Sequence, residues 1–338
     1  MRKNLNFLLL AVLLFLFAYY VSPLIDGIVM GIAFAYVAKP VKIKLEKRFG
    51  GFSSSIISTL MILLPVSFLM FYGLFQGLSQ LVYLLTHRSE LETVILKILR
   101  GAKLQKYSAY VVAYLPTLEN IIRYYFKASA LNITIKTVTF FMNFLISAIV
   151  CFYVLCDGER LFASFIAVVP DDKKEEIREL LVKIDKTLIS LWFGNFAFAV
   201  IVGIVSVPFF IVFRVPYIPM FSGLMFLAAL IPVFAEWMII LPLAAFLAVN
   251  NFTSALWFLL TGVVFLYIFP ELVLRPHFVG YASNIHPLLL LLAFIGGAMA
   301  GGISGFFIAP MVVATLTAIH SHFQDRQKVI NLNLDLKP

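Results

Sequence analysis

One long stretch of this chain is almost without charge. Between Leu188 and Ile319 the acidic and basic side chains are only Arg214, Glu236, Glu271 and Arg275. A helix of ~20 residues crosses the hydrocarbon core of a bilayer, and this stretch is several times that long. Across the whole chain 62% of the residues are hydrophobic and 13% are charged, whereas soluble domains average about 45–50% and about 25%. A soluble enzyme, a disordered chain and a secreted disulfide scaffold are therefore excluded, and the sequence predicts a polytopic membrane protein.

The apolar runs define the predicted architecture. We expect an all-α polytopic membrane protein with about eight transmembrane helices, together with amphipathic interfacial helices. Two runs, 217–250 and 287–319, are too long for one straight span and contain prolines or glycines. We expect them to be interrupted near Pro232 and within Gly296–Gly305. The sequence leaves open whether each is a broken span or a re-entrant hairpin.

Composition divides the chain into successive stretches. They are N-terminal transmembrane helices (1–87), amphipathic extramembrane or interfacial helices (88–131), a transmembrane helix (132–157), a charged cytoplasmic helix (158–187), a C-terminal transmembrane transport core (188–320) and a polar tail (321–338). The first apolar run is longer than that of a signal peptide, so we expect it to be retained as a span. The positive charges of a basic loop at 39–50 place this loop, the N-terminus and helix 171–187 on the cytoplasmic side.

The net charge of +9 does not indicate nucleic-acid binding. The basic residues gather beside apolar runs, as Lys39, Lys42 and Lys44 do, which is typical of loops at an anionic membrane face. Cys151 and Cys156 have the spacing of neither a redox motif nor a zinc motif, and the scattered histidines predict no metal site. No HExxH, GxSxG or Walker motif is present. The sequence therefore predicts a protein that is not an enzyme, has no cofactor and has the lipid bilayer as a partner.

Glu236 is the most informative single residue. It follows Pro232 inside a long apolar run, and a charged carboxylate at membrane depth is costly unless it is paired or hydrated. Glu236 either contributes to a substrate, cation or proton site beside a helix break, or ends a short helix near the interface with Trp237 as an anchor. Both interpretations stay open at this point.

Glu271 and Arg275 form the second candidate pair. They stand four residues apart between Pro270 and Pro276, a spacing that allows an ion pair on one helical turn. The pair is either structural, at the end of a span, or has a role in gating or substrate binding.

A glycine series marks the last apolar run. Gly297, Gly301 and Gly305 recur at every fourth residue, with Gly296 alongside and Pro310 following. Small residues at this spacing allow close helix packing, and glycine also weakens a helix by about 0.5–1 kcal/mol relative to alanine. The series therefore predicts close packing, a flexible or broken helix at a translocation path, or both.

Several short motifs carry a resemblance to a known family. They are Phe152-Tyr153-Val154-Leu155 with Asp157-Gly158-Glu159-Arg160, then Val215-Pro216-Tyr217, Ile231-Pro232, Arg275-Pro276, Gly280, Ile285-His286-Pro287 and Ala309-Pro310. With them the chain resembles the autoinducer-2 exporter family of membrane permeases over nearly its whole length. One position departs from the pattern: relatives usually carry a glycine and a proline shortly after the Ile-Pro pair, where this chain has Ala235 and Glu236. The carboxylate is thus more particular to this protein.

The resemblance implies secondary export of a small polar solute, oligomeric assembly and, as in some members, sodium or lithium/proton antiport. We include Asn284 and His286 of the closing stretch among the candidates for substrate contact. The leading hypothesis is an exporter in the cell membrane that works by conformational cycling as a homo-oligomer. The alternatives are a sodium(lithium)/proton antiporter with Glu236 as the titrating group, and an oligomeric channel or a non-transporting membrane scaffold.

Overall fold

The computed structural model describes residues 2–86, 92–93, 96, 100, 105–231, 236–248, 251–275 and 285–335. Every regular element in these ranges is helical, and six helical stretches are long and apolar enough to cross a membrane. The prediction of an all-α polytopic membrane protein is confirmed. Pro232, Asn284 and most of 88–104 lie outside these ranges, so the predictions made for them stay predictions.

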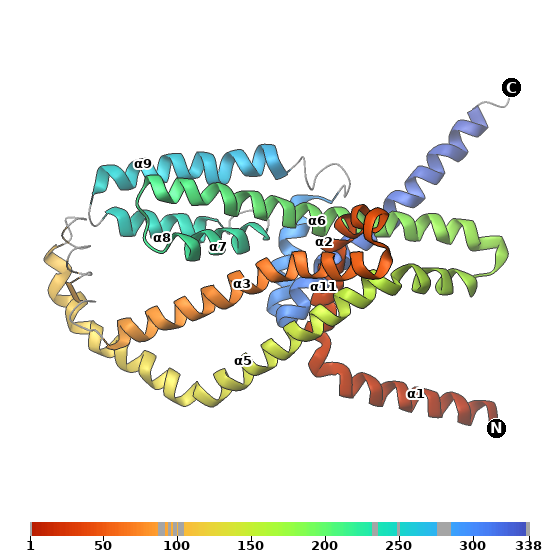
Figure 1. Ribbon diagram of the computed structural model, residues 1–338, viewed down its shortest axis with the longest axis horizontal. Helices are drawn as coiled ribbons and strands as arrows, with labels where there is room; N and C mark the ends of the chain where they lie inside the picture. Colours follow the sequence, from red (N-terminus) through yellow and green to blue (C-terminus); the bar gives the residue numbers. More distant parts are fainter. Residues whose placement is uncertain are drawn as a thin grey trace.

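The N-terminal helices begin with one that projects from the body of the molecule. Helix α1 (Arg2–Val21) extends away from the bundle (Figure 1) and is joined by η1 (Ser22–Leu24) to α2 (Ile25–Phe49), which lies within it. The side chain of Asn143 holds this junction, because its Oδ1 accepts from the Gly27 N–H at 2.8 Å and its Nδ2 donates to the Pro23 carbonyl at 3.0 Å. A Cβ at Gly27 or Gly31 would overlap the α5 backbone, so these glycines allow α2 and α5 to pack closely.

The basic segment 39–49 is helical, which corrects the prediction of a loop. Helix α2 continues through it to Phe49 and ends at Gly50, whose φ of 76° suits glycine. Lysine, glutamate and arginine favour helix once the apolar run has ended. Lys42 and Glu46 also form an i,i+4 ion pair at 2.7 Å. The charge pattern therefore marks the polar end of a helix.

Long helices connect stretches that composition separates. After α3 (Gly51–Thr86) and η2 (Gln105–Tyr107), α5 (Ser108–Ala167) joins an amphipathic stretch and an apolar run in one helix. After η3 (Asp171–Lys173), α6 (Lys174–Val212) likewise begins charged and ends apolar. An ion pair of 2.7 Å between Lys39 and Asp185 puts the end of α2 beside the charged half of α6. The segments 39–50 and 171–187 thus lie at one end of the bundle, as the predicted orientation requires.

The run 217–250 is interrupted, as predicted. It forms α7 (Ile218–Ala229) and α8 (Trp237–Ala248), each of 12 residues and ~18 Å long, well short of the ~30 Å hydrocarbon core. Helix α7 packs along α6, and α8 packs along α9 (Phe252–Gly262), which continues as the π-helical segments η4 (Val263–Ile268) and η5 (Pro270–Leu274). Figure 1 shows α7 and α8 at the same end of the molecule, beside α6 and α9.

The run 287–319 is also interrupted, within α11 (Pro287–Asp335). Gly301 (φ −136°, ψ 17°) and Gly302 (φ 58°, ψ −132°) leave the helical conformation, and the positive φ of Gly302 favours glycine. The arms 287–300 and 303–335 fold back on each other, since a Cβ at Gly297 would overlap the carbonyl of Gly305, and the rings of Phe294 and Phe306 lie 4.8 Å apart. Both predicted roles of the glycines occur. The helices pack closely at Gly297 and Gly305, and the helix is broken at 301–302.

Candidate functional site

Arg275, which follows η5, is the centre of a buried group of polar side chains. Its Nε donates to Glu271 Oε2 at 2.7 Å, its Nη1 to Asn195 Oδ1 at 2.8 Å and its Nη2 to the Ala229 carbonyl oxygen at 3.2 Å. Its guanidinium carbon lies 4.1 Å from the centroid of the Phe198 ring. Because Arg275 is only 9% exposed, these contacts satisfy a charge inside the protein and tie η5 to α6 and α7.

Local helix geometry explains this arrangement. The last carbonyl groups of a helix lack partners within it, and a cation near them is favoured by the helix dipole. Arg275 supplies that cation to the end of α7 from another helix. The predicted i,i+4 pair between Glu271 and Arg275 is confirmed, with side chains only 15% and 11% exposed. π-Helical turns such as η5 are frequent at functional sites.

Glu236 lies at the other side of the same break. It directly precedes α8, and its carbonyl oxygen accepts from the N–H groups of Ile239 and Ile240 at 3.1 and 3.0 Å. It therefore ends a short helix, as one interpretation held. It is buried at 1% exposure, however, and it interacts electrostatically with Arg275 and Glu271. Its Oε2 has no hydrogen-bond partner in the part of the chain that the structure describes.

One segment of α6 contacts both helix breaks. The Trp192 ring lies 6.1 Å from Phe294 and 5.2 Å from Phe307, one on each arm of α11. About one turn further along α6, Asn195 binds Arg275. Trp192 Nε1 and Asn195 Nδ2 are buried without a partner among the residues that are described. We call Trp192, Asn195, Glu236, Glu271 and Arg275 the buried polar cluster.

The break in α11 is held by a residue of α2. The Ser304 backbone N–H, at the start of the second arm, donates to Asp26 Oδ1 at 2.9 Å. A carboxylate in this position satisfies an N–H that has no partner within its own helix and is favoured by the helix dipole. Asp26 thus caps the second arm in the way that Arg275 caps α7.

The structure separates some predicted site residues from the cluster. His286 directly precedes α11, where its Nδ1 accepts from the Leu288 N–H at 3.2 Å. Gly296 has open space around its Cα, and Pro310 lies within the second arm. The sequence analysis missed Trp192, Asn195 and Asp26. For Asn195 the available signal was an amide inside the apolar run 188–213. Asp26 is charged, but nothing in the sequence connects it to Ser304, 278 residues later.

Comparisons with known proteins agree with this architecture. The model of the AI-2E transporter family matches residues 8–325. A protein of Archaeoglobus fulgidus named "Putative transport protein" is 52% identical over 312 residues, which cover 92% of each chain. A similarly named protein of Methanocaldococcus jannaschii is 28% identical over 328 residues, or 93% of this chain and 95% of its own. One of Methanothermobacter thermautotrophicus is 26% identical over 299 residues, or 87% and 86%. Such a match along nearly the whole chain, on a bundle of membrane-spanning helices, shows that this protein is a multi-pass membrane transporter of the AI-2E family.

Proposed function

We propose that the protein is a secondary transporter that exports a small polar solute across the cell membrane, with the solute bound at the buried polar cluster. The observation that carries this proposal is that three of the six buried side-chain atoms without partners among the described residues belong to this cluster: Trp192 Nε1, Asn195 Nδ2 and Glu236 Oε2. Leaving one such atom unpaired costs about 1–3 kcal/mol. A solute that accepts hydrogen bonds from the two donors and gives one to the carboxylate removes that cost.

The two helix breaks support a site at this place. Irregular backbone at membrane depth is tolerated where it is buried in protein or lines a cavity, and many secondary transporters bind their substrates between discontinuous helices. Here α6 is linked to the α7–α8 break through Asn195 and Arg275, and it contacts the α11 hairpin through Trp192. A movement at either break therefore changes the surroundings of neighbouring side chains on one turn of α6, which is what conformational cycling needs.

A solute screen in proteoliposomes tests the proposal. Purified protein is reconstituted and the counterflow of labelled polar solutes is measured with and without imposed proton or sodium gradients. We expect Asn195→Ala to lower transport about tenfold, the change that ~1.4 kcal/mol of lost binding produces. The matched control is Ser206→Ala, a buried α6 position whose hydroxyl donates to the Gly203 carbonyl. Equal activity of both variants would place the solute elsewhere.

The second candidate is sodium or lithium/proton antiport through Glu236. The free carboxylate oxygen of this buried residue supports it, because buried ionisable groups in membrane segments mark ion and proton pathways. Cation-driven proton movement in proteoliposomes, without any organic solute, distinguishes antiport from solute export. A single-channel conductance would favour the channel alternative, and the absence of flux with every solute and ion would favour a scaffold. Cross-linking of the reconstituted protein tests the proposed homo-oligomer.

A further inference from the structure

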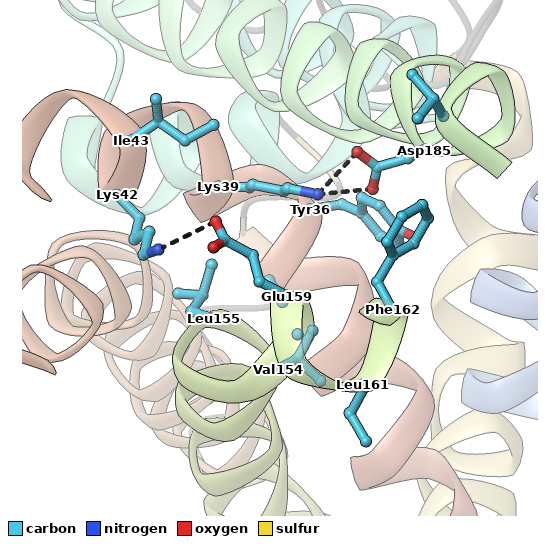
Figure 2. Close-up of a pocket in the computed structure, with 13 residues that line it drawn as sticks. Tyr36, Lys39, Lys42, Ile43, Val154, Leu155, Glu159, Leu161, Phe162 and Asp185 are labelled. Atoms are coloured by element: carbon cyan, nitrogen blue, oxygen red, sulfur yellow. Dashed lines mark hydrogen bonds and ion pairs between the residues drawn. The ribbon is translucent and has the colours of Figure 1, made fainter. Parts of the chain in front are cut away.

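A cavity lies at the charged end of the bundle, away from the buried polar cluster. It has a volume of about 490 Å³ and lies between α2, α5 and α6. Its polar lining comes from Tyr36, Lys39, Lys42, Glu159 and Asp185, and Figure 2 shows these side chains together with apolar neighbours on α5. Along α6, Asp185 stands ten residues before Asn195, ~15 Å at helical rise. The cavity is therefore a separate site.

The lining changes from apolar to charged at one level. The apolar part of α2 ends at Ala38, that of α5 ends at Cys156, and that of α6 begins at Leu188. The cavity straddles this level, with Val154 and Leu155 on one wall and the two lysines above them. In a membrane protein such a level marks the boundary between hydrocarbon and headgroups. The cavity is thus placed to hold a molecule that is polar at one end and apolar at the other.

Two lysine amines at the cavity are available to an anionic headgroup. Lys42 is buried, with its Nζ 2.7 Å from Glu46 and 3.9 Å from Glu159, whose side chain is 88% exposed. Lys39 contacts both oxygens of Asp185 at 2.7 Å. Figure 2 shows both amines directed toward the cavity from α2. The lining itself matches these two lysines with Glu159 and Asp185. The exposed cations Lys44, Lys47 and Arg48 follow on α2 outside the lining.

We propose that this cavity binds an anionic membrane lipid, with its phosphate between Lys39 and Lys42 and the start of an acyl chain along the apolar wall. Basic pockets between transmembrane helices are known to take such headgroups. The lysine stems are long enough to turn from their carboxylate partners toward a phosphate. Helices α5 and α6 contact each other little, and at the cavity Glu159 of α5 and Asp185 of α6 each pair with a lysine of α2. A lipid bound at this point therefore stabilises the packing of all three helices.

Native mass spectrometry of the delipidated full-length protein tests the proposal. Each lipid is added back to the protein in a separate sample. We expect phosphatidylglycerol to bind and phosphatidylcholine not to bind under the same conditions. The double variant Lys39→Gln/Lys42→Gln should bind phosphatidylglycerol about thirtyfold more weakly, since we expect each lysine in contact with the phosphate to contribute about fivefold. The matched control is Lys44→Gln/Lys47→Gln, which removes the same charge from the same end of α2 outside the cavity lining. We expect it to bind within a few-fold of the parent protein.

Two further measurements keep the experiment decisive if the double lysine variant is poorly folded. Val182→Trp narrows the cavity without changing its charge, and we expect it to lose the lipid as well. Inorganic phosphate at matched concentration should leave the melting temperature unchanged where phosphatidylglycerol raises it. Equal losses in the two lysine pairs would reduce the effect to surface charge and overturn the proposal. So would full lipid binding by Val182→Trp, or a shift with phosphate equal to that with lipid.

Discussion

Asp26 and Ser304 are 278 residues apart in the chain, yet the carboxylate of one accepts a hydrogen bond of 2.9 Å from the backbone N–H of the other. The contact joins the start of α2 to the turn of the α11 hairpin. At the second break, the Arg275 guanidinium binds the Ala229 carbonyl at the end of α7. At each break, a side chain from another helix caps the free helix end. Its charge is opposite to the partial charge of that end of the helix dipole.

Replacing Asp26 with alanine should destabilise the hairpin. The loss of a helix-capping side chain costs about 0.5–2 kcal/mol, so we expect Asp26→Ala to lower the melting temperature of the purified protein by a few degrees and to reduce transport. Asp26→Asn keeps an oxygen that can accept the Ser304 N–H and serves as the control. The interpretation is wrong if the asparagine and alanine variants melt at the same temperature.

Two adjacent glycines of α11 should differ in their tolerance of alanine. A methyl group at Gly297 would overlap the Gly305 carbonyl, whereas one at Gly296 meets nothing within 4 Å. Overpacking of this kind costs about 1–3 kcal/mol. We expect Gly297→Ala to lower both the yield of folded protein and its melting temperature, and Gly296→Ala to behave like the parent. Similar behaviour of the two variants would contradict the hairpin packing.

Neutralising Arg275 should be among the most destabilising single changes. Arg275→Gln leaves Glu271 buried without its ion-pair partner, and breaking a buried pair in this way costs about 3–5 kcal/mol. Arg275→Lys keeps the charge but cannot reproduce the contacts to Asn195 and Ala229 together, so we expect it to fold better than the glutamine variant and still to lose transport. Thermal unfolding and counterflow measure the two effects. The control is Arg160→Gln at an exposed pair with Asp157, which should change stability by less than about 0.5 kcal/mol.

Glu236→Gln separates the two candidate functions. The substitution keeps the size and hydrogen-bonding capacity of the side chain and removes its titration. If transport is proton-coupled through this residue, the variant should fold normally and lose the pH dependence of transport measured between about pH 5 and 8. Glu176→Gln, at an exposed position of α6 that pairs with Arg326, is the control. An unchanged pH profile in Glu236→Gln would reduce the residue to a cap of α8.

The predicted orientation can be measured with a single cysteine. Lys47 is exposed near the end of α2, whereas the native Cys151 is buried. We expect a membrane-impermeant maleimide to leave Lys47→Cys unmodified in intact cells and to label it after lysis, because basic segments favour the cytoplasmic side. The Cys156→Ala background removes the other thiol that a reagent can reach. Labelling of intact cells would invert the topology.

The sequence was sufficient for the features that depend on local composition. The apolar runs predicted the helices, the prolines and glycines predicted both interruptions, and the spacing of Glu271 and Arg275 predicted their ion pair. It was insufficient where neutral residues acquire importance through distant partners. Asn195 is one amide in an apolar run until Arg275, 80 residues later, donates to it. The charge content of 39–49 also led to a wrong prediction of a loop. A change from apolar to basic residues marks the membrane boundary and not the end of a helix.

The backbone contact between Gly297 and Gly305 has a mechanical consequence for the α11 hairpin. At this point backbone lies against backbone, so no side-chain rotamer there can change to alter the angle between the arms, and closely packed elements deform little. We therefore expect the two arms to move together as one rigid unit, which we call the wedge. Any displacement of the wedge must break the Asp26–Ser304 hydrogen bond or slide the rings of Phe294 and Phe307 across Trp192, so the hinge lies at the borders of the hairpin and not at its glycines.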